Sequence, residues 1–142
     1  MSPLNLVAVF VQNTPGQTSR LTRLLADAGI NIFWVTIASN GSFGVMKVLV
    51  DKPEAALEAL KREGLMVSLL EVVAVETVNQ PGALYRVAEC LGQNNINLDN
   101  CSGFVANNHA ILLIEVHEAA RAQSLLAKAG FNLLRQEALL KL

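Results

Sequence analysis

Apolar residues along the chain follow two alternating patterns, one typical of strands and one typical of amphipathic helices. Leu6–Val11 is a continuous β-branched and apolar run, which favours a buried strand. The next run, beginning at Leu21, has apolar residues at i, i+3, i+4 and i+7, which favours a helix. The first half of the chain is predicted to contain, in order, strand Leu6–Val11, helix Pro15–Ala28, strand Asn31–Ala38, strand Phe43–Val50, helix Pro53–Glu63 and strand Leu65–Leu70.

The same order of elements returns 66 residues later, as position 79 lies 66 places after position 13. Asn13-Thr14-Pro15-Gly16 reappears as Asn79-Gln80-Pro81-Gly82, and Arg20 is matched by Arg86. Identities at turns, core positions and helix ends share this one offset, which indicates a duplicated unit. The second copy is predicted to contain strand Val72–Val78, helix Pro81–Gln93, strand Asn97–Val105, a turn at Asn107-Asn108, strand Ala110–His117, helix Ala119–Ala129 and strand Asn132–Leu140.

The β-α-β-β-α-β order is that of the ferredoxin-like split unit, with two helices on one face of a four-stranded antiparallel sheet. The fold class is therefore predicted to be α+β, with two tandem ferredoxin-like units at residues 1–70 and 71–142. Asn40-Gly41 is a strong hairpin signal within the first unit. Residues 65–78 contain no Gly, Pro or Asn, so one strand is expected to run into the next with a bend at most. Without a flexible linker, the two units are expected to form one rigid body.

Each unit has a tight Asn-x-Pro-Gly turn between its first strand and its first helix. Proline fixes φ and lacks an N–H group, so it is expected in the first turn of the helix. The Asn or Thr before it is expected to cap the helix through a side-chain oxygen. The first N–H groups of the helix point outward, where the dipole favours an anion such as a carboxylate. The turn therefore has two interpretations, plain helix capping and ligand binding.

The amino-acid composition limits the classes of function that the chain can have. Hydrophobic residues make up 52% of the chain and charged residues 16%, so apolar material is left over for a subunit or domain interface. The net charge is −1 without a basic cluster, and the central strands lack stacking aromatic residues, which argues against nucleic acid. No apolar run reaches the ~20 residues of a membrane span, and no signal peptide is visible. Cys90 and Cys101 fit neither a metal nor a disulfide framework, which favours a cytoplasmic protein.

Catalytic and metal-binding arrangements are not evident from the spacing of residues. His109 and His117 would lie ~26 Å apart along one strand, too far to share a metal. Phosphate loops, dinucleotide motifs, Ser-His-Asp arrangements and paired carboxylates cannot be proposed either. The sequence therefore predicts no catalysis, no cofactor and no metal.

The duplicated turn, together with Gly29-Ile30-Asn31-Ile32 at the opening of the second strand, resembles the ACT domain, a small βαββαβ regulatory module. The second copy, Asn95-Ile96-Asn97-Leu98, has asparagine where the family has glycine, although asparagine also tolerates left-handed φ. The resemblance covers essentially the whole chain. It implies a regulator that senses a free amino acid where units meet and that forms a homodimer. The target would be an enzyme or a transcription factor.

The resemblance also implies which residues touch the ligand, namely the turn of one unit and the second strand of its neighbour. Backbone N–H groups after the glycine would take the carboxylate, and asparagine side chains would meet both charged groups of the amino acid. The candidates are Asn13, Thr14, Gly16, Gln17 and Asn31 in the first copy, and Asn79, Gln80, Gly82, Ala83 and Asn97 in the second.

The second strands of the two copies differ in polarity. Asp99, Asn100 and Ser102 place polar groups just past the strand opening in the second copy only. These residues have two interpretations. They could form a polar pocket in which Asp99 meets an ammonium group, or they could be a solvated strand end. The alternative function for the whole chain is an oligomerisation or protein-interaction scaffold with degenerate pockets that regulates a partner enzyme or transcription factor.

Overall fold

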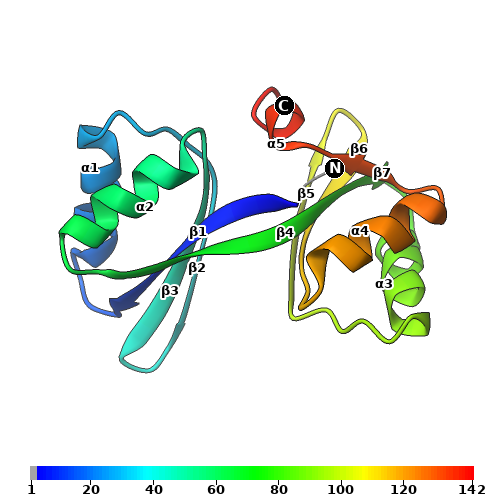
Figure 1. The fold of residues 1–142 in the computed structure, drawn as a ribbon, viewed down its shortest axis with the longest axis horizontal. Coiled ribbons are helices and arrows are strands. Elements are labelled where there is room, and N and C mark those ends of the chain that lie inside the picture. Colours follow the sequence, from blue (N-terminus) through cyan, green and yellow to red (C-terminus); the bar gives the residue numbers. More distant parts are fainter. Residues whose placement is uncertain (1–2) are drawn as a thin grey trace. The chain divides into compact units, whose positions relative to one another are not determined.

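The structure, a computed structural model, describes residues 3–142, drawn in Figure 1. The chain divides into two compact units. The N-terminal unit comprises residues 5–70, and the C-terminal unit comprises residues 71–142 together with Pro3 and Leu4. Each unit has the order β-α-β-β-α-β, so the predicted α+β fold of two tandem ferredoxin-like units is confirmed.

The N-terminal unit packs two helices on one face of its sheet. Its elements are β1 (Leu4–Gln12), α1 (Gln17–Asp27), β2 (Ile32–Asn40), β3 (Phe43–Val50), α2 (Pro53–Arg62) and the beginning of β4 (Met66–Val78). The strand order is β2-β3-β1-β4, with antiparallel β1–β3 and β2–β3 pairs. Val7 and Val9 of β1 alternate toward the helices and meet Leu21 and Leu25 of α1 in a fully buried core.

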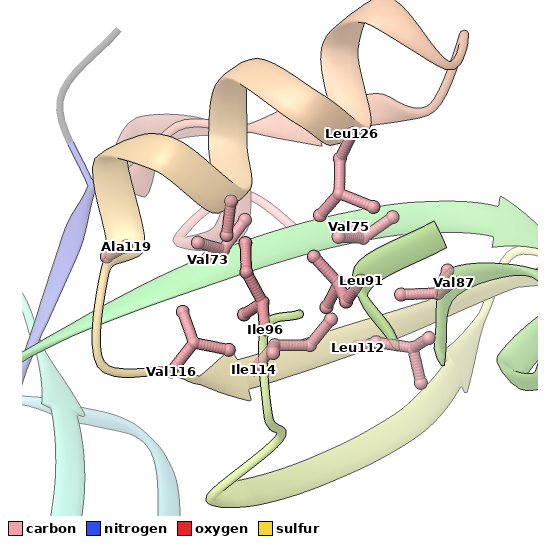
Figure 2. Close-up of a cluster of buried hydrophobic side chains, with 11 residues drawn as sticks. Val73, Val75, Val87, Leu91, Ile96, Leu112, Ile114, Val116, Ala119 and Leu126 are labelled. Carbon is pink, nitrogen blue, oxygen red and sulfur yellow. The ribbon is translucent and has the colours of Figure 1, made fainter. Parts of the chain in front are cut away.

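The C-terminal unit repeats this arrangement. Its elements are the rest of β4, α3 (Ala83–Gln93), β5 (Asn100–Ala106), β6 (His109–Glu115), α4 (Ala119–Lys128), β7 (Asn132–Leu134) and α5 (Gln136–Leu139). The strand order is β7-β4-β6-β5. Figure 2 shows its core, in which Leu91 of α3 and Leu126 of α4 pack with the valines of β4.

Strand β4 joins the two units. It runs from Met66 to Val78 as one strand of 13 residues. This confirms the prediction that the last strand of the first unit continues into the first strand of the second. The physical reason is the run of apolar and β-branched residues without a turn-forming residue in between.

Residues with left-handed backbone follow the four long helices. Gly29, Gly64 and Gly130 follow helices and have φ of 72°, 76° and 91°. Asn95 takes the same role with φ of 59°, which confirms that asparagine replaces the glycine of the first copy. The turn at Asn107-Asn108 is also confirmed, because both residues have positive φ, as a type I′ hairpin requires.

The hairpin in the N-terminal unit lies one residue later than predicted. Asn40 pairs with Phe43 in the ladder, so the two turn residues are Gly41 and Ser42 rather than Asn40 and Gly41. Gly41 has φ of 71°, which suits the first position of a type II′ turn. The 66-residue offset indicates the same turn position, since Gly41 and Ser42 match Asn107 and Asn108.

Two strands of the C-terminal unit are shorter than predicted by two residues or more. The last strand ends at Leu134 instead of Leu140, and residues 136–139 form α5, whose Leu139 is buried. Gln-Glu-Ala-Leu are all strong helix formers, which explains this change. The second strand begins at Asn100 rather than Asn97, because the Asn97 side chain bonds locally to Asp99 instead of extending the ladder.

Candidate functional site

The two Pro-Gly turns have nearly identical backbones. Gly16 and Gly82 both have φ of 89°, and each stands at the N-cap position of its helix. The helices begin at Gln17 and Ala83, so Pro15 and Pro81 lie before the helix rather than in its first turn. The predicted helix starts at Pro15 and Pro81 are therefore wrong by two residues. A left-handed residue interrupts the helical backbone, and only the residue after it can start the helix.

Side-chain capping by Asn or Thr is also wrong, because neither helix has a side-chain cap hydrogen bond. Backbone groups close the first turn instead: Gln17 N–H donates to the carbonyl of Thr14 at 3.3 Å, and Arg20 N–H to that of Gly16 at 3.0 Å. The second turn repeats both bonds at matching positions, from Ala83 to Gln80 at 3.3 Å and from Arg86 to Gly82 at 3.0 Å.

Free N–H groups remain at the start of both helices. Within residues 3–142, the backbone N–H groups of Thr18 and Ser19 donate to no acceptor, and those of Leu84 and Tyr85 are equally free. Space beside Gly16 is also open, because a Cβ there would meet no atom within 4 Å, and a Cβ on Gly82 would meet only Arg86 Nη1 at 3.8 Å. The helix dipole adds partial positive charge at this end. Both corners can therefore receive a carboxylate.

The asparagines of the two turns differ in their contacts. Asn13 Nδ2 donates to the carbonyl of Gly41 at 3.1 Å, which ties the turn to the β2–β3 hairpin 28 residues away. Its backbone N–H donates to the carbonyl of Ser42 at 2.8 Å. Asn79 repeats only the backbone bond, to Asn108 at 3.3 Å, and its side chain bonds to no residue that the structure describes. The Asn13 amide is thus engaged in holding the fold.

Replacing Asn13 with Ala should lower the free energy of unfolding by about 0.5–1.5 kcal/mol, because the side-chain hydrogen bond to Gly41 is lost. Asn79→Ala is the matched control at the same place in the repeat, and it should change stability by less than about 0.5 kcal/mol. Urea unfolding followed by circular dichroism measures both. Equal effects of the two substitutions would contradict a structural role confined to Asn13.

The polar residues at the strand openings are engaged with one another. Asn31 N–H donates to Asp51 Oδ1 at 3.1 Å, and Asp51 N–H donates back to the carbonyl of Asn31 at 3.3 Å. Asp51 does not cap α2, because the N-cap of this helix is Lys52 and no side chain caps it. In the other unit, Asn97 Nδ2 donates to Asp99 Oδ1 at 3.2 Å. Asn100 opens β5 opposite Glu115.

A crevice of about 450 Å³ lies beside the first turn. It is lined by the end of β1, the start of α1, the first residue of β3, the segment between α2 and β4, and the first residue of β4. Its lining comprises Phe10, Val11, Gln12, Gln17, Arg20, Phe43, Gly64, Leu65 and Met66. Of the residues predicted for this copy, only Gln17 is among them. The lining also includes exposed apolar side chains, among them Phe43, which is 62% exposed, and Met66, which is 70% exposed.

A second crevice, of about 520 Å³, occupies the same place in the C-terminal unit. Its lining comprises Glu76, Thr77, Val78, Arg86, His109, Ala129, Gly130, Phe131 and Asn132. Eight of these positions lie 66 residues after a lining position of the first crevice. Duplication of the chain has therefore duplicated the crevice. Sequence reasoning missed these residues because they come from four separate segments, although the repeat offset relates the two sets.

Of the predicted candidates, only Gln17 lines either crevice. The lining of the two crevices includes neither Asn31 nor the group Asn97, Asp99 and Asn100. Thr14 and Gln80 contribute backbone carbonyls to the turns, and Ala83 is buried at the start of α3. Each turn and its crevice are the features that the structure places side by side.

Both cysteines pack against the hydrophobic core of the C-terminal unit. Cys90 packs against the buried cluster of the C-terminal unit, and its Sγ lies 4.0 Å from the carbonyl of Leu125. Burial raises the pKa of the Cys101 thiol. A raised pKa disfavours the thiolate, which is the nucleophilic form. Within residues 3–142, no group of three or more His, Cys, Asp or Glu side chains is arranged to hold a metal ion.

Comparison with known proteins gives the family. The family model described as ACT domain pair matches residues 2–142, so the chain belongs to the ACT domain pair family. Members of this family are regulatory modules, and the chain has a regulatory role. No helix in the described part of the chain has the length and apolar character of a membrane span. No curated protein matches the sequence.

Solved structures have the same fold. Protein BT0572 from Bacteroides thetaiotaomicron is 28% identical, with a TM-score of 0.91, over 99% of this chain and 98% of that one. The ligand-free regulatory subunit of aspartate kinase from Thermus thermophilus is 18% identical, with a TM-score of 0.66, over 91% of this chain and 94% of that one. The second likeness concerns the fold alone.

Proposed function

We propose that this protein senses a free amino acid and regulates a partner through it, without catalysing a reaction. Membership of the ACT domain pair family supports this function. The observation that carries it is the crevice beside an open Pro-Gly corner, present once in each unit. A free amino acid fits within cavities of this size.

The chemistry of each crevice suits a carboxylate. Arg20 lines the first crevice, and its guanidinium forms no hydrogen bond or ion pair with residues 3–142. The free N–H groups of Thr18 and Ser19 lie at the N-terminus of the same helix. A guanidinium and a helix N-terminus both favour an anion, and charge-assisted hydrogen bonds are stronger than neutral ones. The ligand would enter with its carboxylate toward the start of the helix.

Assembly belongs to the same proposal. The edge strand β2 exposes three large apolar side chains, Phe33, Val35 and Ile37, at 42%, 48% and 53%. An exposed apolar edge strand favours pairing with another chain. We therefore include a cytoplasmic homodimer in the proposal, with residues 1–70 and 71–142 as its ligand-binding domains. An enzyme or a transcription factor is the proposed target.

Titration calorimetry with the twenty L-amino acids should give saturable heat with one or a few of them. At about 100 times its dissociation constant, a bound amino acid should stabilise the fold by about 2.7 kcal/mol, which thermal unfolding detects. The matched control is the carboxamide of the same amino acid, which lacks the carboxylate and should bind far more weakly. If no member of the panel binds, the sensor proposal fails and the interaction scaffold takes its place.

A further inference from the structure

We infer that the C-terminal crevice is the one that recognises a free amino acid as a zwitterion, with Glu76 receiving the ammonium group and Arg86 the carboxylate. This inference rests on the proposed function and assigns it to one of the two crevices. The N-terminal crevice instead complements a carboxylate attached to an apolar body.

Glu76 is held in place by two neighbours in the C-terminal crevice. Asn132 Nδ2 donates to its Oε1 at 2.7 Å, and His109 Nδ1 lies 3.7 Å from the same oxygen. Oε2 accepts no hydrogen bond from residues 3–142. The side chain is 23% exposed, so it is partly shielded from water. A fixed carboxylate with one free oxygen is suited to a primary ammonium group.

Arg86 supplies the opposite charge in the same crevice. It lies on the first turn of α3, and its Nη1 lies 3.8 Å from the position that a Cβ on Gly82 would occupy. The guanidinium forms no hydrogen bond or ion pair with the residues that the structure describes, and it does not pair with Glu76. Two opposite charges that line one cavity without meeting leave room for a ligand that carries both.

The N-terminal crevice contains the equivalent arginine but not the polar residues around Glu76. Arg20 stands where Arg86 stands in the repeat. The three interacting positions Glu76, His109 and Asn132 are all apolar in the first copy, where they are Phe10, Phe43 and Met66. The lining of the N-terminal crevice contains no acidic side chain. The three positions differ together, so only the C-terminal crevice has an acidic side chain that can receive an ammonium group.

The test compares an amino acid with its 2-oxo acid, which keeps the carboxylate and the side chain but lacks the ammonium group. The twenty L-amino acids are first titrated into the full chain, with calorimetry for affinity and amide NMR for location. The affinity of the amino acid that binds most tightly is then compared with that of its 2-oxo acid, for example L-alanine with pyruvate or L-leucine with 4-methyl-2-oxopentanoate. Shifts are expected around residues 76–78 and 129–132.

Glu76→Gln should weaken amino-acid binding about 10- to 100-fold, because a charge-assisted hydrogen bond is lost, and should leave the 2-oxo acid nearly unaffected. Arg86→Gln should weaken the binding of both the amino acid and the 2-oxo acid, because both carry the carboxylate. Arg86 is exposed, so this variant folds even if Glu76→Gln does not. Glu89→Gln makes the same charge change outside the crevice on α3 and should leave binding unchanged.

Two results are kept distinct. If an amino acid binds but Glu76→Gln and Arg86→Gln leave its affinity unchanged, or if the shifts gather around Arg20, the assignment is overturned and the sensor function stands. If none of the twenty binds the wild-type chain, the sensor function itself fails. Equal weakening of the amino acid and its 2-oxo acid by Glu76→Gln would also overturn the role given to Glu76.

Discussion

Leu25→Ala and Leu91→Ala should each lower the free energy of unfolding by about 2–5 kcal/mol. The two leucines occupy the same place in the repeat, one on α1 and one on α3, and both are fully buried. Each lies in the core cluster of its own unit, so its loss removes apolar contacts and leaves a cavity. Urea unfolding followed by circular dichroism measures the change.

Leu84→Ala is the matched control for this pair. Leu84 also lies on α3 but is 49% exposed, so its truncation should change stability by no more than about 0.5 kcal/mol. If Leu91→Ala destabilised the protein no more than Leu84→Ala does, the core described for the C-terminal unit would be incorrect. The same comparison with Leu25→Ala tests the N-terminal unit.

Gly16→Ala and Gly82→Ala should each destabilise the protein by about 1–2 kcal/mol. Both glycines have φ of 89°, where a Cβ approaches the following carbonyl oxygen. Gly16 has no atom within 4 Å of the added Cβ, and Gly82 has only Arg86 Nη1 at 3.8 Å. The penalty therefore comes from the backbone conformation and not from a clash with a neighbour.

Gly92→Ala provides a control of opposite sign. Gly92 lies inside α3, and a Cβ there would meet no atom within 4 Å. Alanine in a helix interior should stabilise the protein by about 0.5–1 kcal/mol relative to glycine. Thermal unfolding of the three variants measures the difference. A stabilising Gly82→Ala would show that the turn does not require the left-handed conformation.

The sequence alone determined the order of elements, their duplication and the class of the fold. Strand runs such as Leu6–Val11 and the helical stripe from Leu21 are local signals, because an element's buried face is written in the spacing of its own residues. Gly29 and Asn95 could be assigned as left-handed helix ends for a similar reason, since few residues tolerate that φ. The repeat supports these assignments, because both copies indicate the same local structure.

Tertiary structure decided the site. Asn13 was predicted as a cap or ligand contact, yet its amide bonds to Gly41, 28 residues away. Glu76, His109 and Asn132 come from β4, β6 and β7, and only the folded sheet brings them together. Periodicity records which face of an element is buried, whereas a crevice depends on where the ends of several elements meet. That meeting is a property of the packed chain and leaves no periodic trace in the sequence.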